Sequence, residues 1–293
     1  MKYPFLGFSI FFIFCLTYQN SPVAVQIRGP TREQDFVITM PLKDKKRLDS
    51  LFRHLCLVEL WGHTLMRSKP VTFTGYKKPS FSARSLTHFI FFLKDLRRSW
   101  RWKTWLKYQT YFSDSPFQIF ENADPACSSH IEMIIMDTEY FSQILKKYRE
   151  DFQRVLGKKS IDPEALMKEA KQSSLLSEVL KNHDGLIGTV LGYGRENAWA
   201  FYDQSCGKDV DLVLAWEPEL LDQMIVQLSK KDWTLTSWEL SDLYYPCFMS
   251  KKNSEETIQL RQLYQKSREK FIRYYQGKDF VEATLSLLAG DSP

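Results

Sequence analysis

The chain contains few of the residues that form metal and redox sites. Its 293 residues include five cysteines and five histidines. No two cysteines have a C-x-x-C spacing, which argues against a zinc ribbon or a thioredoxin-type site. The histidines form neither an H-E-x-x-H motif nor an H-x-x-x-H pair, so a zinc hydrolase is not supported. We therefore expect neither a bound metal nor a cofactor.

Signatures of other enzyme classes are missing as well. The sequence contains no G-x-S-x-G motif of an α/β-hydrolase and no G-K-[ST] phosphate loop. The net charge is +5, from 40 basic and 35 acidic residues spread along the chain, and this small excess does not predict nucleic-acid binding. A nucleophile such as Cys206 with His183 is conceivable, but no local motif favours it. These absences favour a protein that is not an enzyme and leave the question open.

The clearest long apolar segment lies at the N-terminus, from Phe5 to Leu16. It is shorter than the roughly 20 residues of a membrane span and is typical of a secretory signal. We predict a signal peptide over residues 1–25, with Ala24 as a possible cleavage position, followed by a polar linker over residues 26–40. An uncleaved anchor through residues 5–18 is the alternative. Export would permit disulfides, with three pairings or none among Cys56, Cys127, Cys206 and Cys247.

Residues 41–293 are expected to form a single mixed domain with an α+β fold, predominantly helical with a few short strands. Apolar periodicity and capping residues predict helices over 41–62, 82–111, 137–157, 161–182, 217–231 and 254–290, the last one broken at Gly277. Apolar segments bounded by turns predict strands over 63–76, 117–120, 131–137 and 209–216. Pro70 would confine the first of these strands to a sheet edge. Asp137 and Asp162 are expected to cap their helices.

Four of the twelve glycines fall within ten positions of the segment NHDGLIGTVLGYGRENAWAFY, residues 182–202. Gly192 and Gly194 fit the start of a dinucleotide fingerprint, G-x-G-x-x-G. However, Asn197 stands at the third glycine position, and too few residues follow for a normal crossover helix. Nucleotide binding is therefore not favoured.

A helix explains the glycine segment better. Asp184 can cap it, and Gly185, Gly188 and Gly192 would then lie on one face. Because interior glycines destabilise a helix, we expect another element to approach this face closely. Gly192 would also help to end the helix, before a second helix that starts near Arg195.

Polar side chains gather around the same glycines and could converge on a pocket at residues 185–197, with Arg195 as an anchor for an anion. Helix capping and local ion pairs would use the same side chains, and this alternative stays open. The turn at Ser68–Pro70 could lie nearby. The candidate ligand-binding residues are Lys69, His183, Tyr193, Arg195, Glu196 and Asn197.

The segment LRRSWRWKTWLKY, residues 96–108, alternates basic residues with tryptophans. These residues do not form one clean apolar stripe on a helix, so some tryptophans could be exposed and contact an anionic membrane surface. Alternatively, the helix faces the core, and its arginines stack over aromatic rings and reach solvent. The surface-binding candidates are Arg97, Arg98, Arg101, Trp102 and Trp105.

Three stretches carry a resemblance: SKPVTF at 68–73, GLIGTVLGYGRENAW at 185–199 and KFIRYYQGKDFVEATLSLL at 270–288. Together they resemble a group of proteins from chlamydia-like and similar intracellular bacteria, over most of the chain beyond the leader. The resemblance implies a bacterial, host-associated setting, and it brings no known activity or catalytic residues. It also implies that the 68–70 turn and the glycine segment belong together.

Two hypotheses follow from the sequence. The first is an exported protein, secreted or associated with the cell envelope, that acts by binding. Its partner would be an anionic membrane surface or an envelope or host protein, and not a nucleic acid. The second is an enzyme or a small-ligand-binding protein with a pocket at residues 185–197. The sequence does not predict the oligomeric state.

Overall fold

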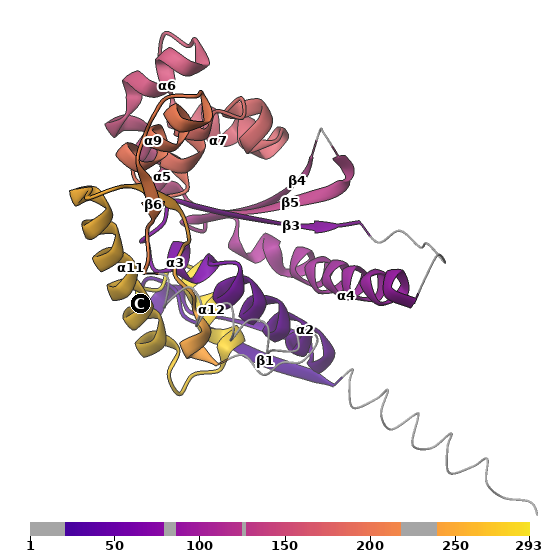
Figure 1. Cartoon of the computed structure of the whole chain (residues 1–293). Helices are drawn as coiled ribbons and strands as arrows, with labels where there is room; N and C mark the ends of the chain where they lie inside the picture. The colour runs from indigo at the N-terminus through magenta and orange to yellow at the C-terminus, as the bar shows by residue number, and fades with distance from the viewer. Residues whose placement is uncertain (1–20, 79–85, 125–126, 218–238) are drawn as a thin grey trace, which may run out of the picture.

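The computed structural model describes residues 21–78, 86–124, 127–217 and 239–293 (Figure 1). The fold is α+β and predominantly helical, with its strands in small antiparallel sheets, as the sequence predicts. None of the helices within these ranges is both long and apolar enough to cross a membrane.

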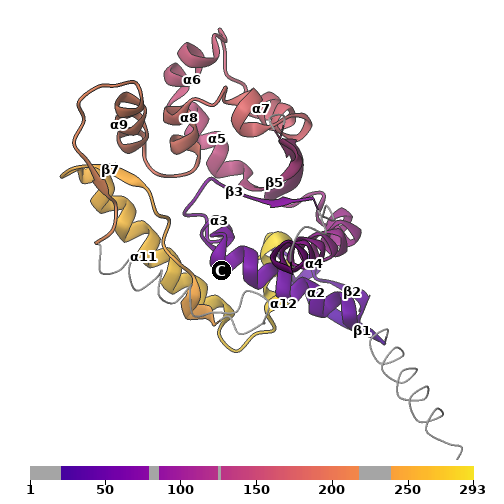
Figure 2. The same cartoon turned by 45° about the vertical axis from the view of Figure 1, so that its right-hand side comes forward.

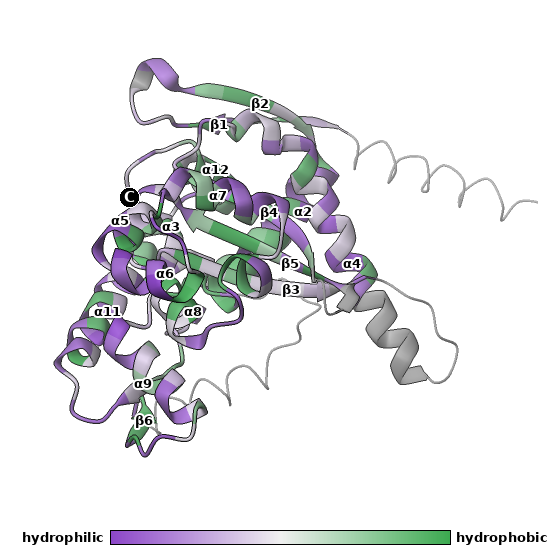
Figure 3. Ribbon diagram, turned by 90° about the horizontal axis from the view of Figure 1, so that it is seen from above, coloured by the Kyte–Doolittle hydropathy of each residue, from purple (hydrophilic) through white to green (hydrophobic). Residues whose placement is uncertain are grey.

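The described chain opens with a β-hairpin. Strands β1 (Pro22–Ile27) and β2 (Phe36–Pro41) pair antiparallel. Every second residue points into the core, where Val25, Ile27 and Met40 are fully buried. The hairpin lies along one side of the molecule and packs against α12 (Phe280–Leu288) (Figure 3). The predicted linker over residues 26–40 is therefore wrong, because the alternating apolar residues of this segment bury one face of a hairpin.

The predicted leader lies mostly outside the described residues, which begin at residue 21. Its last residues belong to β1, which starts at Pro22. Of the predicted signal peptide over residues 1–25, the part from Pro22 onward is thus a strand of the fold.

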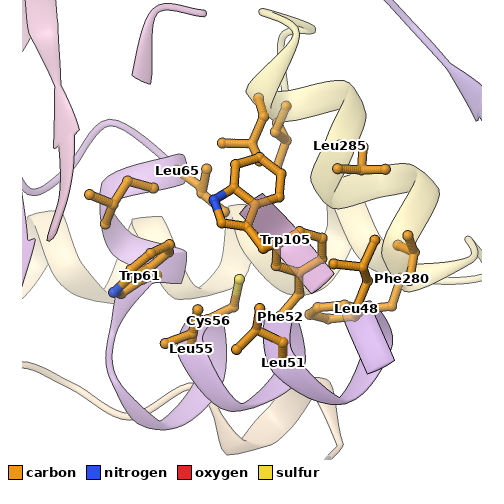
Figure 4. Close-up of a cluster of buried hydrophobic side chains, with 14 of the residues drawn as sticks. Leu48, Leu51, Phe52, Leu55, Cys56, Trp61, Leu65, Trp105, Phe280 and Leu285 are labelled. Atoms are coloured by element: carbon orange, nitrogen blue, oxygen red, sulfur yellow. The ribbon is translucent and has the colours of Figure 1, made fainter. Parts of the chain in front are cut away.

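The largest core forms between helices from both ends of the chain. Helix α2 (Leu42–Arg53) continues into the one-turn π-helix η2 (His54–Val58), which is followed by α3 (Trp61–Leu65). Figure 4 shows Leu51, Phe52 and Cys56 converging with Trp105 of α4 (Leu86–Tyr108) and with Phe280 and Leu285 of α12. The first predicted helix is confirmed over α2, with Pro41 directly before it.

A three-stranded sheet separates this core from a second one. The order is β3 (Val71–Lys77), β5 (Cys127–Asp137) and β4 (Phe117–Asp124), all antiparallel. Along β5, Met133 and Ile135 belong to the first core, whereas Ile134 and Met136 belong to the second. β3 lies at an edge of the sheet, which confirms the expectation from Pro70.

Short helices build the second core on the other face of the sheet (Figure 1). The predicted helix over 137–157 is divided at Tyr148, and Asp137 caps its first part by accepting a hydrogen bond from the Tyr140 amide. Asp162 caps the next helix, as predicted. The helices are α5 (Thr138–Lys147), α6 (Arg149–Leu156), α7 (Pro163–Gln172), the one-turn η4 (Leu175–Val179) and α8 (Asp184–Val190).

The last third of the described chain begins with the second half of the glycine segment. It contains α9 (Arg195–Ser205), β6 (Leu212–Leu214), β7 (Met249–Lys251) and α11 (Glu255–Tyr275). The closing helices are broken at Gly277, with a φ of +74°, as predicted. The helix predicted over 217–231 lies outside the described residues from residue 218 onward. Short 3-10 helices occupy Arg32–Gln34, Gln109–Phe112 and Leu240–Asp242.

Candidate functional site

The glycine segment forms two short helices joined by a tight turn. Gly192 and Gly194 have φ values of +79° and +86°, a backbone conformation that favours glycine, and α9 begins directly afterwards at Arg195. A Cβ atom on Gly188 would lie 2.7 Å from the Cβ of Ala198. The predicted close approach of another element is thus found between α8 and α9, which lie side by side (Figure 2).

Two details of the predicted helix are wrong. Its N-cap is His183, whose Nδ1 accepts a hydrogen bond from the Leu186 amide, and Asp184 is the first helical residue. The helix ends at Val190, so Gly192 lies in the turn and does not share a helical face with Gly185 and Gly188.

The glycine turn rests on the loop before β3. A Cβ atom on Gly192 would lie 3.0 Å from Pro70 Cδ and 3.3 Å from Lys69 Cγ. From the other side, the Tyr264 hydroxyl of α11 donates a hydrogen bond to the Gly192 carbonyl at 2.6 Å. The Ser68–Pro70 turn and the glycine turn are therefore neighbours in space, although more than a hundred residues separate them.

A cavity of about 260 Å³ opens between α8, α9 and the start of β7, beside the glycine turn. Tyr193 and Phe248 stack at its wall, with 4.9 Å between ring centroids. Among the described residues that line it, Asp184, Asn197 and Tyr193 carry polar side-chain groups. Its larger apolar lining residues are Ile187, Leu191, Phe201, Phe248 and Met249. Small-molecule sites are commonly concave and mostly apolar with few polar groups, as this lining is.

Arg195 does not line this cavity, because its guanidinium is paired elsewhere. Its Nε and Nη2 atoms donate to the two carboxylate oxygens of Asp151 in α6, at 2.5 and 3.1 Å. The hydrogen bond with Asp151 is the main cause that raises the pKa of Arg195. The guanidinium also lies 5.8 Å from the Trp199 ring centroid. Arg195 thus joins α9 to α6, and the structure does not support it as an anion anchor.

Glu196 and Asn197 also serve the packing of α9. The Glu196 carboxylate accepts a hydrogen bond from the Ser254 hydroxyl at 2.9 Å. The fully buried Asn197 donates to the Tyr193 carbonyl and accepts from the Thr257 hydroxyl, at 2.9 and 3.1 Å. Glu196 and Asn197 thus bond within the fold, mainly to residues 58 and 60 positions away, whereas the alternative drawn from the sequence was capping and local ion pairs.

The N-terminus of α9 has a cap from a distant helix. Glu256 of α11 accepts hydrogen bonds from the amides of Arg195 and Asn197 at 2.9 and 3.3 Å. Burial raises the pKa of Glu256, and the bonds from these amides oppose that rise. Sequence reasoning missed this residue, since 61 positions separate it from Arg195 and no local motif marks the pair.

His183 lies outside the cavity and is held by aromatic rings. Its imidazole stacks on Tyr202 with 4.0 Å between centroids and lies 5.1 Å from the Trp199 ring. Burial lowers its pKa. Cys206, considered above as a nucleophile with His183, is exposed and carries a free thiol.

Lys69 is the most unusual of the predicted residues. Its side chain is 2 % exposed, and it forms neither an ion pair nor a hydrogen bond within the described part of the chain. Its Nζ lies 5.2 Å from the ring centroid of Tyr193. Burial lowers the pKa of the amine to about 7. Lys69 therefore lies behind the ring that forms one wall of the cavity and does not itself line the cavity.

A buried serine–histidine pair was not predicted. His63 Nε2 lies 2.8 Å from the Tyr244 carbonyl, and Nδ1 lies 3.0 Å from the Ser267 hydroxyl. Because a carbonyl only accepts, Nε2 carries the proton and Nδ1 accepts from Ser267, while Ser68 donates to Ser267 at 2.7 Å. Burial lowers the pKa of His63 to about 3, so this imidazole is a weak base. The pair joins α3 to α11, 204 positions apart, and has no sequence signal.

The tryptophans predicted to contact a membrane are in the core. Trp102 and Trp105 are each 1 % exposed, because α4 is packed against α2 and the sheet. Trp100 is the half-exposed tryptophan of this segment. Arg98 donates to the Gly75 carbonyl at 3.2 Å, Arg97 is exposed, and Arg101 is partly buried. The surface prediction is therefore wrong for Trp102 and Trp105, and the core-facing alternative describes them.

The structure also bears on the disulfides and the metal binding that were considered from the sequence. Cys56, Cys206 and Cys247 are free, and the side chain of Cys127 is outside the described set. Within the described ranges, no three histidine, cysteine or acidic side chains gather closely enough to hold a metal ion. The chain matches no protein-family model, no curated protein and no solved structure.

Proposed function

We propose that the protein binds a small, largely apolar molecule in the cavity beside the glycine turn. The observation that supports this proposal is the cavity itself, about 260 Å³ in volume and lined by side chains from α8, α9 and the residues that lead into β7. A dry cavity of about 150 Å³ accommodates benzene. The present cavity is therefore suited to a body of about one to two fused rings.

The polar residues around the cavity favour binding over catalysis. Arg195, Glu196 and Asn197 have partners within the fold. The groups with unusual acid–base properties, His63 and Lys69, are buried outside the lining. A general base must reach the proton that it removes, and neither group meets this condition at the cavity.

Indole is a suitable first probe, and ligand-observed NMR can measure its affinity. Ile187→Trp places a large ring in the cavity and is expected to weaken indole binding by about tenfold or more. Ile258→Trp is the matched control, because Ile258 is 46 % exposed on α11 and is not a lining residue. Indole binding that is the same in both variants and the parent, or no binding at all, would contradict the proposal.

The cellular setting is a second part of the proposal. The apolar N-terminal segment supports an exported protein, and the resemblance supports an intracellular bacterium as its source. With Trp102 and Trp105 buried, contact with an anionic membrane surface would depend on Trp100, Arg97 and Arg101. Sedimentation with anionic vesicles tests this contact, which the triple change of these residues to alanine should abolish, and a parent protein that does not sediment with the vesicles would contradict it.

A further inference from the structure

The cavity has one charged residue among its described lining residues, Asp184. Its carboxylate accepts a hydrogen bond from the Ser205 hydroxyl at 3.3 Å. It forms no ion pair with any basic side chain that the structure describes. Asp184 therefore brings to the lining a carboxylate that no described arginine or lysine neutralises by direct contact.

Aromatic rings provide the rest of the recognition surface. Tyr193, Phe201 and Phe248 line the cavity, and Phe201 is 42 % exposed. Aromatic faces carry partial negative charge and attract organic cations. Phe248 and the Lys69 amine already contact the faces of Tyr193, so Phe201 is the residue best placed to offer a ring face to an ammonium group beside the carboxylate.

Several basic residues of this region have carboxylate partners of their own. Arg195 pairs with Asp151. Lys208 pairs with Asp203 at 2.8 Å, and Lys252 pairs with Asp211 at 3.0 Å. These ion pairs give the three basic side chains carboxylate partners other than Asp184.

Lys69 is the residue that would favour an anionic ligand instead. Its amine faces the Tyr193 ring, but it does not line the cavity, whereas Asp184 does. A charge in the cavity lining interacts more strongly with a ligand than one on the far side of an aromatic ring, because Coulomb interactions weaken with distance.

We infer that the ligand is a small organic cation, with its ammonium group at Asp184 and its apolar body among Tyr193, Phe201 and Phe248. This inference rests on the proposed function and specifies its ligand class. The cavity volume limits the body to about the size of one or two rings.

Three probes of nearly equal size test the inference on the full chain. They are 2-phenylethylammonium, 2-phenylethanol and phenylacetate, and calorimetry or ligand-observed NMR gives their dissociation constants. We expect the cation to bind about 5–20-fold more tightly than the alcohol, and the anion to bind most weakly. This comparison needs no variant, so it holds even if a substitution impairs folding.

Two variants locate the effect. Asp184→Asn should reduce the preference for the cation over the alcohol to less than about twofold. Asp203→Asn is the matched control, since Asp203 is an acidic residue of α9 that pairs with Lys208 and does not line the cavity. It should leave the preference unchanged.

Each other outcome overturns the inference in a recognisable way. Equal affinities for the three probes would remove the cation preference and leave the proposed binding function intact. Tightest binding of phenylacetate would replace Asp184 with Lys69 as the recognising charge. Binding of none of the probes, and of no indole, would remove the proposed function itself.

Discussion

The amine of Lys69 lies 5.2 Å from the ring centroid of Tyr193, and no carboxylate in the described part of the chain pairs with it. A cation–π contact contributes about 2 kcal/mol when desolvated, which is less than the cost of removing a full charge from water. The turn that supports the cavity wall therefore contains a charge that is poorly compensated in the folded state.

Replacing Lys69 should stabilise the protein. Burial lowers the pKa of this amine from 10.5 to about 7, so between these pH values the unfolded chain binds more protons and stability rises with pH. Lys69→Met removes the charge and keeps the length of the side chain. We expect it to raise the free energy of unfolding near pH 7 by about 1–4 kcal/mol.

Denaturant unfolding at pH 6, 8 and 10 checks this prediction. The parent should gain stability with pH over this range relative to Lys69→Met, so that the two converge at the highest pH. A variant that is less stable than the parent at every pH would show that Lys69 is a net stabilising residue.

The buried His63–Ser267 pair should contribute measurably to stability. Ser267→Ala removes the donor to His63 Nδ1, whereas the Ser68 hydroxyl keeps the His63 carbonyl as its acceptor. Leaving buried polar groups without partners costs about 1–3 kcal/mol. Thermal or denaturant unfolding measures the loss, and Ser113→Ala, at an exposed serine, should change stability little. Equal effects of the two substitutions would show that the pair contributes nothing.

Acid should unfold the protein partly through His63. Its pKa falls from 6.5 to about 3 on folding, so the unfolded chain binds more protons between these values. The stability from neutral His63 is complete above about pH 6.5 and is lost as the pH falls towards 3. His63→Gln should be less stable at pH 7 and should show a flatter dependence over pH 4–6. A slope identical to that of the parent would exclude this contribution.

The contact between Gly188 and Ala198 should be a tight one. A Cβ atom on Gly188 would lie 2.7 Å from that of Ala198, so Gly188→Ala forces α8 and α9 apart and should cost about 1–3 kcal/mol. Adding Ala198→Gly relieves the clash. The double variant should therefore be more stable than the sum of the two single effects predicts, and strict additivity would contradict the close contact.

Processing of the leader should preserve the hairpin. Val25 and Ile27 of β1 are fully buried and β1 begins at Pro22, so a cut at Ala24 would remove half of the strand. We expect a mature N-terminus at or before Pro22. The intact mass of the native protein from fractionated cells measures this, and a full-length mass in the cytosol would contradict both cleavage and export.

The sequence by itself determined the features that depend on neighbouring residues. Asp137 and Asp162 cap their helices, Pro70 precedes an edge strand, and Gly192 and Gly194 separate α8 from α9. Each follows from the conformation or hydrogen bonds of a few consecutive residues, which apolar periodicity and capping rules describe. The region of the cavity could be indicated in the same way, because the glycines mark a close packing of helices.

The tertiary structure decided which side chains are free. Arg195 is paired with Asp151, 44 positions away, and Glu256 caps α9 from another helix. Trp105 lies in the core although its helix has no clear apolar stripe. Lys69 is buried in a turn and has neither an ion pair nor a hydrogen bond with its side chain among the described residues. Partners and burial depend on which distant segments come together, and local sequence rules do not contain that information. For this reason the sequence indicated the place of the candidate site, whereas the fold selected Asp184 and the aromatic rings as its chemistry.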